Sequence, residues 1–431
     1  MTRSWSPVTL SPYRFIAVGA KKYGILKAGR TLSSRNERCA MHVVILGAGY
    51  AGLRTALNLD RQLREHGMDD TVTLVDQNSY HQLIQKIHVT ATSGVHSPEA
   101  IYSLGHLLVN RQITFVQGRV RTIAPLDREV LLDDGRSLPY DRLVIALGSE
   151  TAYYNVPGAR EHSLPLRTYV EATRLRDHLI AQFNAAAQES DPKQQRIMLT
   201  TAIVGGGCTG CELAGELAAW VDSLSKETGA PRSEVRIALL DRNKLLLKQF
   251  GQWASREAER VFDIHGVSVY LHTAIESVEP QMLRVSGGRV LRAGTIVWVA
   301  GIRAPSIIAD AGLPVNGAGK AVVDSYLRVN GHDAIFALGD CATIAAESDG
   351  SPLPSTASYA LRQGEYMAET IFAEMTGKAT RSYEPLKLGE LVSLGPDNGV
   401  GNPLGMPILG HPVLILKKGI EQYYRASITA L

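Results

Sequence analysis

The sequence predicts an α/β fold in which two similar units follow one another along the chain. Residues 42–59 join a short β-branched run to a helical pattern through the turn GAGYAG. Residues 198–221 repeat this order through the turn GGGCTG, and a further apolar strand pattern follows each unit, at 138–149 and at 294–305. These observations predict two Rossmann-like domains and a small C-terminal region.

The glycines of the first turn have separate tasks in such a unit. Gly47 allows the tight turn, Gly49 lets the backbone approach a phosphate, and Gly52 lets the helix pack on the strand. The next strand, TVTLVD, ends at Asp76, whose carboxylate can accept hydrogen bonds from ribose hydroxyls. Strand, turn, helix, strand and terminal acid in register predict a bound dinucleotide.

The second unit carries the same signature. Its turn places glycines at three matching positions, Gly205, Gly207 and Gly210. Its second strand, VRIALLD, ends at Asp241, and a carboxylate there favours a free 2′-hydroxyl, so we expect NADH in preference to NADPH. Arg242 follows directly and could partly accommodate a 2′-phosphate, which leaves this preference open.

Three more strand ends complete the predicted crevice. LPYDRLVIALGS leads to Gly148, GTIVWVAGIRAP contains Gly301, and DAIFALGDCA leads to Gly339 and Asp340. We expect a helix to follow Asp340, whose carboxylate can hydrogen-bond ribityl hydroxyls. The polar segment DSLSKETGAPRSE, residues 222–234, predicts a surface loop.

These patterns divide the chain into consecutive parts. The predicted parts are an extension or targeting segment (1–40), a first dinucleotide-binding domain in two pieces (41–160 and 303–376), an inserted second dinucleotide-binding domain (161–302) and a C-terminal region (377–431). The extension holds eight Lys or Arg and one acidic residue, Glu37, which is typical of a mitochondrial transit peptide but also of an over-extended reading frame that starts truly at Met41.

Composition excludes several classes of protein. No apolar run reaches the roughly 18 residues that span a bilayer. Four cysteines in 431 residues are too few for a secreted disulfide framework, so we expect a cytoplasmic protein, or a mitochondrial one if residues 1–40 are a transit peptide. Outside residues 1–40 the chain is nearly neutral, which argues against a nucleic-acid partner, and no metal site is predicted.

The order of these motifs, with Glu212 after the second turn and with VWVAGIRAPS and IFALGDCA further on, resembles the type II NADH dehydrogenases. These are non-proton-pumping NADH:quinone oxidoreductases within the FAD-dependent pyridine nucleotide-disulfide oxidoreductases. A more distant likeness, through LVSLGPDNGVG, is to ferroptosis-suppressor and apoptosis-inducing-factor-like flavoproteins. The resemblance implies FAD in the first unit, NADH in the second and quinone as acceptor, with monomer and homodimer both open.

The resemblance also implies catalytic positions. It places Glu212 at the nicotinamide ribose, although a carboxylate in a first helical turn also stabilises the helix dipole. The two glutamines that meet quinone in that family correspond here to Ser358 and Arg362 in PSTASYALRQGEYMA. Because these side chains differ, the identity of the acceptor stays open.

The C-terminal stretch HPVLILKKGIEQYYRASITAL interleaves apolar residues with Lys417, Lys418 and Arg425. This pattern predicts either an amphipathic segment on a membrane surface or an ordinary packed helix with a solvated basic edge.

Two other functions compete with quinone reduction. The pair Cys208 and Cys211 has the spacing of a dithiol reductase, but it lies in the phosphate turn, where a nucleotide would cover it, so we expect packing roles. A flavoprotein that binds both nucleotides, turns over slowly and senses redox state is the other alternative.

Overall fold

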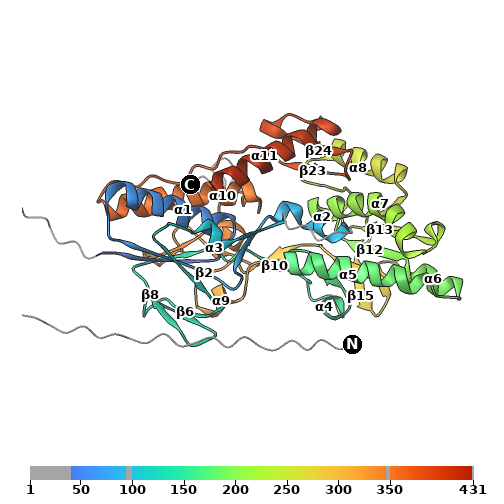
Figure 1. Cartoon of the computed structure of the whole chain (residues 1–431), viewed down its shortest axis with the longest axis horizontal. Helices are drawn as coiled ribbons and strands as arrows, with labels where there is room; N and C mark the ends of the chain where they lie inside the picture. The colour runs from blue at the N-terminus through green and yellow to red at the C-terminus, as the bar shows by residue number, and fades with distance from the viewer. Residues whose placement is uncertain (1–39, 94–99, 346–349, 430–431) are drawn as a thin grey trace, which may run out of the picture. The chain divides into compact units, whose positions relative to one another are not determined.

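The computed structural model describes residues 40–93, 100–345 and 350–429. The predicted extension at 1–40 lies outside these residues except for Ala40. Residues 40–431 form one compact unit (Figure 1).

A five-stranded parallel sheet forms the first Rossmann-like part. Its strands, in spatial order, are β21 (Ile335–Ala337), β9 (Arg142–Ile145), β1 (His42–Leu46), β2 (Thr71–Asp76) and β5 (Ile113–Gln117). The edge strand β21 comes from much later in the chain than the other four, so this part is discontinuous. Helix α1 (Tyr50–His66) connects β1 to β2 and begins directly after the glycine turn.

A second five-stranded parallel sheet is inserted between β9 and β21. Its strands, in spatial order, are β11 (Leu164–Pro165), β18 (Thr295–Trp298), β12 (Thr200–Val204), β13 (Arg236–Leu240) and β14 (Val267–Tyr270). The helices of this part are α4 (Ala159–His162), α5 (Tyr169–Ala186), α6 (Pro192–Met198), α7 (Cys208–Thr228) and α8 (Gln252–Ile264). The predicted fold of two Rossmann-like parts, one inserted in the other, is confirmed.

Strand periodicity explains how the inserted sheet is covered on both faces. Ile203 of β12 packs into a core with α5, α7 and α8, whereas its neighbours Ala202 and Val204 pack into a core with Leu283 and Val285. The latter two belong to a small antiparallel sheet of β15 (Ile275–Glu279), β16 (Met282–Val285) and β17 (Arg289–Arg292). A matching sheet of β6 (Val120–Ala124), β7 (Glu129–Leu132) and β8 (Ser137–Pro139) accompanies the first part.

Short elements connect these layers. They are β3 (Tyr80–Gln82), η1 (Ile84–Lys86), α2 (Ile87–Thr92), β4 (Ile101–Ser103), α3 (Leu104–Leu107), β10 (Glu150–Thr151), η3 (Arg232–Glu234), β19 (Ile302–Arg303), α9 (Ile307–Asp310), β20 (Ala321–Val322), η4 (Gly339–Cys341) and β22 (Ala342–Thr343).

Helix α10 (Ala357–Met375) packs closely along α1 (Figure 1). The contact depends on Gly364, because an added Cβ there would lie 2.5 Å from the carbonyl oxygen of Ala51 and 2.9 Å from Cβ of Arg54. The two helices thereby bring the predicted acceptor positions on α10 next to the first glycine turn.

One expectation about a helix boundary was wrong. Helix α7 continues to Thr228, so the first half of the segment 222–234 is helical, and only the part after the left-handed Gly229 forms the connection. The helix expected after Asp340 is α10. It begins at Ala357, capped by the Thr356 hydroxyl, after a 3-10 turn and strand β22.

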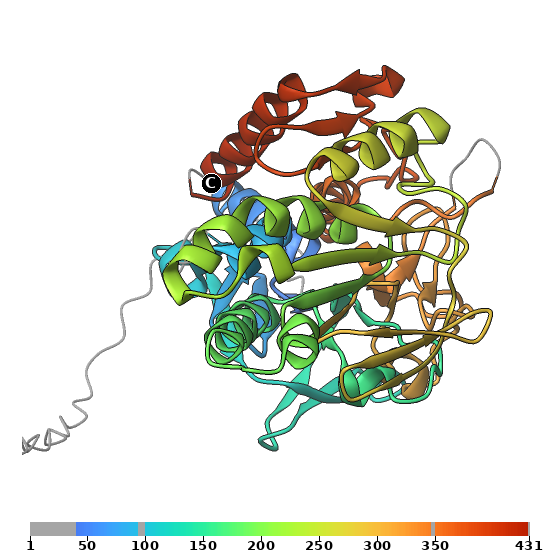
Figure 2. The ribbon, with the colours of Figure 1, turned by 90° about the vertical axis from the view of Figure 1, so that its right-hand side faces the viewer.

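The C-terminal region forms a hairpin-like sheet followed by a helix. Its elements are β23 (Leu391–Ser393), β24 (Gly399–Gly401), η5 (Pro403–Gly405), β25 (Ile408–Leu409) and α11 (His411–Thr429) (Figure 2). Tyr424 and Ile428 of α11 are buried in the main core. Among the described residues, no helix has both the length and the apolar character needed to cross a membrane.

Candidate active site

One cavity of about 1430 Å³ connects the parts of the molecule that the sequence singles out. Its walls come from the first glycine turn, the start of α7, helix α10 and helix α11. Nine predicted site residues line it: Gly47, Gly49, Asp76, Gly148, Glu212, Gly339, Asp340, Ser358 and Arg362. The other six lie outside its lining: Gly52, Gly205, Gly207, Gly210, Asp241 and Gly301.

The geometry of the first turn matches the task expected of each glycine. Gly47 has φ +98°, a backbone conformation that L side chains rarely adopt. A Cβ on Gly52 would lie 1.9 Å from the carbonyl oxygen of Gly47, so helix α1 could not approach the strand. A Cβ on Gly49 would meet no heavy atom within 4 Å, so the space in front of it is free for a phosphate.

The second turn repeats these constraints. Gly205 has φ +119°, and a Cβ on Gly210 would lie 1.8 Å from its carbonyl oxygen. Gly207, like Gly49, faces open space. The helix that starts at each turn directs free backbone N–H groups at this space, which suits an anionic pyrophosphate. Both turns therefore fit dinucleotides.

The acids at the two strand ends hold the turns in place. Asp76 Oδ2 accepts a hydrogen bond from the backbone N of Ala48 at 2.7 Å, and Asp241 Oδ2 accepts one from the backbone N of Gly206 at 2.6 Å. Burial raises the pKa of Asp76, against hydrogen bonds that lower it. The sequence predicted ribose recognition for both acids, and their contact with the turn was missed.

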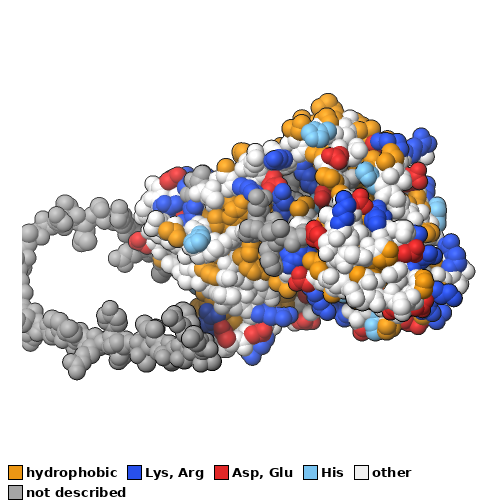
Figure 3. Space-filling view, turned by 45° about the vertical axis from the view of Figure 1, so that its right-hand side comes forward, with side chains coloured by type: hydrophobic (Ala, Val, Ile, Leu, Met, Phe, Trp, Pro, Cys, Tyr) orange, Lys and Arg blue, Asp and Glu red, His pale blue; other side chains and the backbone are white. Residues whose placement is uncertain are grey.

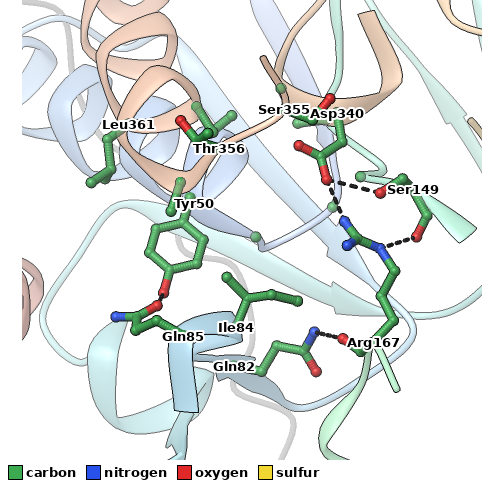
Figure 4. Close-up of a pocket in the computed structure, with 18 of the residues that line it drawn as sticks. Tyr50, Gln82, Ile84, Gln85, Ser149, Arg167, Asp340, Ser355, Thr356 and Leu361 are labelled. Carbon is green, nitrogen blue, oxygen red and sulfur yellow. Dashed lines mark hydrogen bonds and ion pairs between the residues drawn. The ribbon is translucent and has the colours of Figure 1, made fainter. Parts of the chain in front are cut away.

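Asp340 lies at the cavity wall in an ion pair with Arg167 (Figure 4). Its Oδ2 also accepts a hydrogen bond from the Ser149 hydroxyl at 2.8 Å, and Arg167 Nε donates to the Ser149 carbonyl at 3.0 Å. The side chain of Gln363 accepts a hydrogen bond from the backbone N of Gly339 at 2.7 Å and fixes the turn before Asp340. Nothing in the local sequence marks Arg167, which precedes α5 by two residues.

Glu212 sits in the first turns of α7 and pairs with Lys417 of α11. Lys417 Nζ also donates to the Ser393 hydroxyl at 3.0 Å, and His88 Nδ1 lies 3.5 Å from Glu212. Burial alone would raise the pKa of Glu212, but the charge of Lys417 and the hydrogen bonds to the carboxylate lower it overall. Burial lowers the pKa of His88 to about 4, so this ring is neutral at pH 7.

One alternative for α11 was a packed helix whose basic side chains are solvated. Two of the three basic side chains, Lys417 and Arg425, instead form ion pairs with carboxylates. Lys417 pairs with Glu212, and Arg425 pairs with Glu421, which is itself buried and lies 3.0 Å from Lys86. These cations neutralise buried carboxylates, so α11 is built into the cavity wall. Only Lys418 is exposed as predicted.

An aromatic and polar cluster joins α1 to α11 beside the cavity. The rings of Tyr50 and Tyr424 lie 4.8 Å apart, and the Tyr50 hydroxyl bonds to the Gln85 side chain. The Tyr424 hydroxyl lies 2.8 Å from Nε2 of the buried His81, whose Nδ1 lies 2.8 Å from the Ala48 carbonyl oxygen. The cluster links the first glycine turn to the last helix, a relation that no local pattern reveals.

Comparison with known proteins agrees with this geometry. The family model for pyridine nucleotide-disulphide oxidoreductases matches residues 41–364. The chain belongs to this family. FAD and NADH are its cofactors, and the open space at the two glycine turns fits them.

Similar individual proteins include the type II NADH:quinone oxidoreductase of Staphylococcus aureus, which is 29% identical over 384 residues, covering 88% of this chain and 94% of that one. Among solved structures, NDH2 from Plasmodium falciparum in complex with NADH has a TM-score of 0.78 at 18% identity, with 86% of this chain and 92% of that chain covered. The sulfide:quinone oxidoreductase of Aquifex aeolicus has a TM-score of 0.74 at 20% identity, with 91% and 92% covered. At these identities the two structures show the fold alone.

The disulphide in the family name has no counterpart at Cys208 and Cys211, since both are free thiols here. Burial raises the pKa of each thiol, and a raised pKa disfavours the thiolate that disulfide exchange requires. Cys211 is fully buried and its Sγ donates to the Gly206 carbonyl at 3.5 Å. Cys211 is therefore a packing residue, whereas Cys208 is partly exposed at the cavity wall, where its Sγ accepts from the Gln249 side chain at 2.9 Å.

Proposed function

We propose that this protein is an FAD-dependent NADH:quinone oxidoreductase that acts at a membrane surface without pumping protons. The observation that carries the proposal is the continuity of the cavity. It extends from the first glycine turn, past Thr209 and Glu212 at the start of α7, to Ser358 and Arg362 on α10. A reduced nucleotide and an oxidised acceptor can both reach a flavin held in such a space.

Each glycine turn binds a different dinucleotide in this proposal. In our proposal the first turn, with Asp76, Gly148 and Asp340, holds FAD, and the second turn, with Asp241 and Gly301, holds NADH. When bound, FAD accepts a hydride from NADH and passes two electrons to the acceptor. The chain itself contributes position, charge and exclusion of water.

Glu212 and Lys417 are placed to supply a proton. Reduction of a quinone by NADH consumes one proton besides the hydride, and the cavity wall must deliver it to the quinone oxygen. Both side chains line the cavity, and the Lys417 ammonium carries protons while its charge holds Glu212 ionised. We propose that Lys417 donates the proton and that Glu212 keeps it charged and oriented.

The acceptor end of the cavity combines apolar walls with a few polar groups. Leu361 of α10 and Ile420 and Tyr423 of α11 line it together with Ser358 and Arg362. The apolar side chains suit a quinone ring, and the hydroxyl and guanidinium can donate to its carbonyl oxygens. The acceptor is therefore met by Ser358 and Arg362 in place of the two glutamines that the resemblance implies.

The outer face of the C-terminal region explains how a lipid-soluble quinone arrives. Several large apolar side chains are exposed there: Leu404, Met406, Leu409, Ile415, Leu416, Ile420 and Tyr423. Hydrophobic side chains are visible at this edge of the space-filling view (Figure 3). Several exposed apolar side chains in one region, two of which (Ile420 and Tyr423) also line the cavity, favour contact with a membrane surface.

Anaerobic half-reactions test the proposal. NADH should bleach the flavin of the purified protein, and a short-chain quinone should restore the colour much faster than dioxygen does. If NADH leaves the flavin oxidised, or if quinone reoxidises it no faster than dioxygen, the proposal is wrong. The latter result would favour the slow redox sensor.

Replacement of Glu212 tests its role in the second half-reaction. Glu212→Gln should slow reoxidation by quinone by about tenfold or more, because it removes the charge that orients Lys417. Flavin reduction by NADH should stay within about threefold. Glu227→Gln, at an exposed position in the last turn of α7 and outside the cavity lining, is the control and should change neither rate. Selective loss of flavin reduction in Glu212→Gln would instead support a contact with the nicotinamide ribose.

A further inference from the structure

We propose that the second nucleotide site also accepts NADPH, with Arg242 as the residue that binds the 2′-phosphate. The inference rests on the proposed function, because it concerns the electron donor of the same reaction. The sequence predicts a preference for NADH from the Asp241 carboxylate, so the contacts of this carboxylate decide whether NADPH is also accepted.

The Asp241 carboxylate is occupied by its own chain. Oδ2 accepts from the Gly206 backbone N at 2.6 Å, and Oδ1 accepts from both the backbone N and the side-chain Nδ2 of Asn243 at 2.7 Å. Three N–H donors offset much of its charge and leave few lone pairs for a ribose hydroxyl. The carboxylate therefore discriminates weakly against a phosphate.

The first unit contains the same device. Asp76 accepts from the backbone N of Ala48 and from the backbone N and Nδ2 of Asn78 at 2.7, 2.8 and 3.3 Å. In both units, the Asp at the end of the second strand accepts hydrogen bonds from the glycine turn and from the Asn two residues later, and thereby holds the turn in place. Fastening the turn is therefore one task of Asp241, beside its proposed contact with the nucleotide.

Arg242 is available at the same rim. Its side chain is exposed, and in the described part of the chain no carboxylate forms an ion pair with it. The guanidinium lies 5.3 Å from the ring centroid of Tyr154, whose left-handed backbone (φ +53°) sets the ring orientation. The Tyr154 hydroxyl packs onto Gly301, where an added Cβ would lie 1.9 Å from it.

This stack places the guanidinium at the carboxyl edge of the inserted sheet. Asp241 follows β13 and Gly301 follows β18, and dinucleotides bind across the carboxyl ends of such strands. An Arg next to the acid at the end of the second strand is the position from which a 2′-phosphate is bound in this fold. Planar guanidinium donors match phosphate oxygens in pairs.

The local charge also favours the phosphate. Lys244 is exposed two residues further on and has no ion pair within the described residues. Arg242 and Lys244 together exceed the single charge of Asp241, which three donors already offset. Residues 241–248 thus carry three cations and one carboxylate.

A binding experiment isolates the 2′-phosphate from the redox chemistry. The full chain should bind adenosine 2′,5′-bisphosphate at least about tenfold more tightly than 5′-AMP in calorimetry. Arg242→Ala should abolish this ratio and leave 5′-AMP affinity within about twofold. Lys226→Ala removes an exposed charge near the opposite end of α7 and is the control, with the ratio unchanged.

Steady-state kinetics with each nucleotide complete the test. We expect NADPH to support turnover, and Arg242→Ala to lower kcat/KM for NADPH by about tenfold while kcat/KM for NADH stays within about twofold. Equal affinities for the bisphosphate and AMP, or equal effects of Arg242→Ala and Lys226→Ala, would overturn the inference. Failure of NADH to reduce the flavin would count against the proposed function instead, since the binding ratio does not depend on it.

Discussion

The buried His81 ring next to the first glycine turn is held in its neutral form by its surroundings. His81 is fully buried, and because the Ala48 carbonyl can only accept, Nδ1 of the ring carries the proton. Nε2 is then the acceptor for the Tyr424 hydroxyl. A second proton on this ring would place a positive charge in a buried site near Arg54, and burial lowers the pKa of His81 to about 4.

This lowered pKa predicts an acid-labile fold. Below the ordinary value of 6.5 the unfolded chain binds a proton that the folded chain refuses, so stability should fall as the pH drops from 6.5 towards 4. At pH 5 the lowered pKa of His81 should reduce the free energy of unfolding by about 2 kcal/mol relative to neutral pH. His81→Gln should lower stability at pH 7 and reduce the slope between pH 7 and 5, as measured by denaturant unfolding. Part of the slope should remain, because burial also lowers the pKa of His88 to about 4. His265→Gln, at an exposed position, should leave the slope as it is; an unchanged slope in His81→Gln would contradict the assignment.

Helix α11 has an inner face that contacts the rest of the protein and an outer face that is exposed. Its inner face supplies Lys417 to Glu212, Tyr424 to His81 and Ser427, whose Oγ accepts from Arg54 Nη2 at 2.5 Å. Its outer face exposes Ile415 and Leu416. The sequence offered membrane segment and packed helix as alternatives, whereas the structure shows a packed helix with an apolar outer face.

The two faces of α11 can be separated experimentally. Deletion from His411 onward should cost soluble folding and flavin retention, because it removes buried ion pairs and core side chains. Replacing Met406, Leu409 and Ile415 together by Ser changes only exposed residues outside the cavity. This triple variant should keep NADH-to-ferricyanide electron transfer within about twofold but lose at least about tenfold in binding to phosphatidylcholine–phosphatidylglycerol vesicles, measured by flotation. Unchanged flotation would refute the membrane surface, and a stable, yellow deletion protein would refute the structural role.

Across the whole molecule, the features that were predicted correctly are those that depend on short stretches of sequence. Both parallel sheets and both glycine turns followed from the sequence, because close approach and positive φ admit only glycine at Gly47, Gly52, Gly205 and Gly210. Glu212, Ser358 and Arg362 all line one cavity, and their roles there stay predictions.

Contacts between distant segments were not predictable in the same way. Arg167 pairs with Asp340 across 173 positions of the chain, and Lys417 pairs with Glu212 across 205. Neither partner has a periodicity or motif that marks it, because its role arises only when the inserted part and the C-terminal helix pack against the first sheet. The extra turns of α7 were missed for a related reason: burial of Leu224 and Ser225 overrides a polar local composition.

The repeated unit allows the two nucleotide sites to be tested against each other. Gly49 and Gly207 have φ −72° and −79°, and an added Cβ at either would meet no protein atom within 4 Å, so Val should be tolerated by the fold at both. Gly49→Val should yield colourless folded protein, because the side chain fills the space for the FAD pyrophosphate. Gly207→Val should stay yellow and resist bleaching by NADH. Flavin absorbance per chain after gel filtration and anaerobic titration measure both, and Gly52→Ala, with its Cβ 1.9 Å from the Gly47 carbonyl oxygen, should impair folding itself. A yellow Gly49→Val or a colourless Gly207→Val would show that the cofactors are assigned to the wrong units.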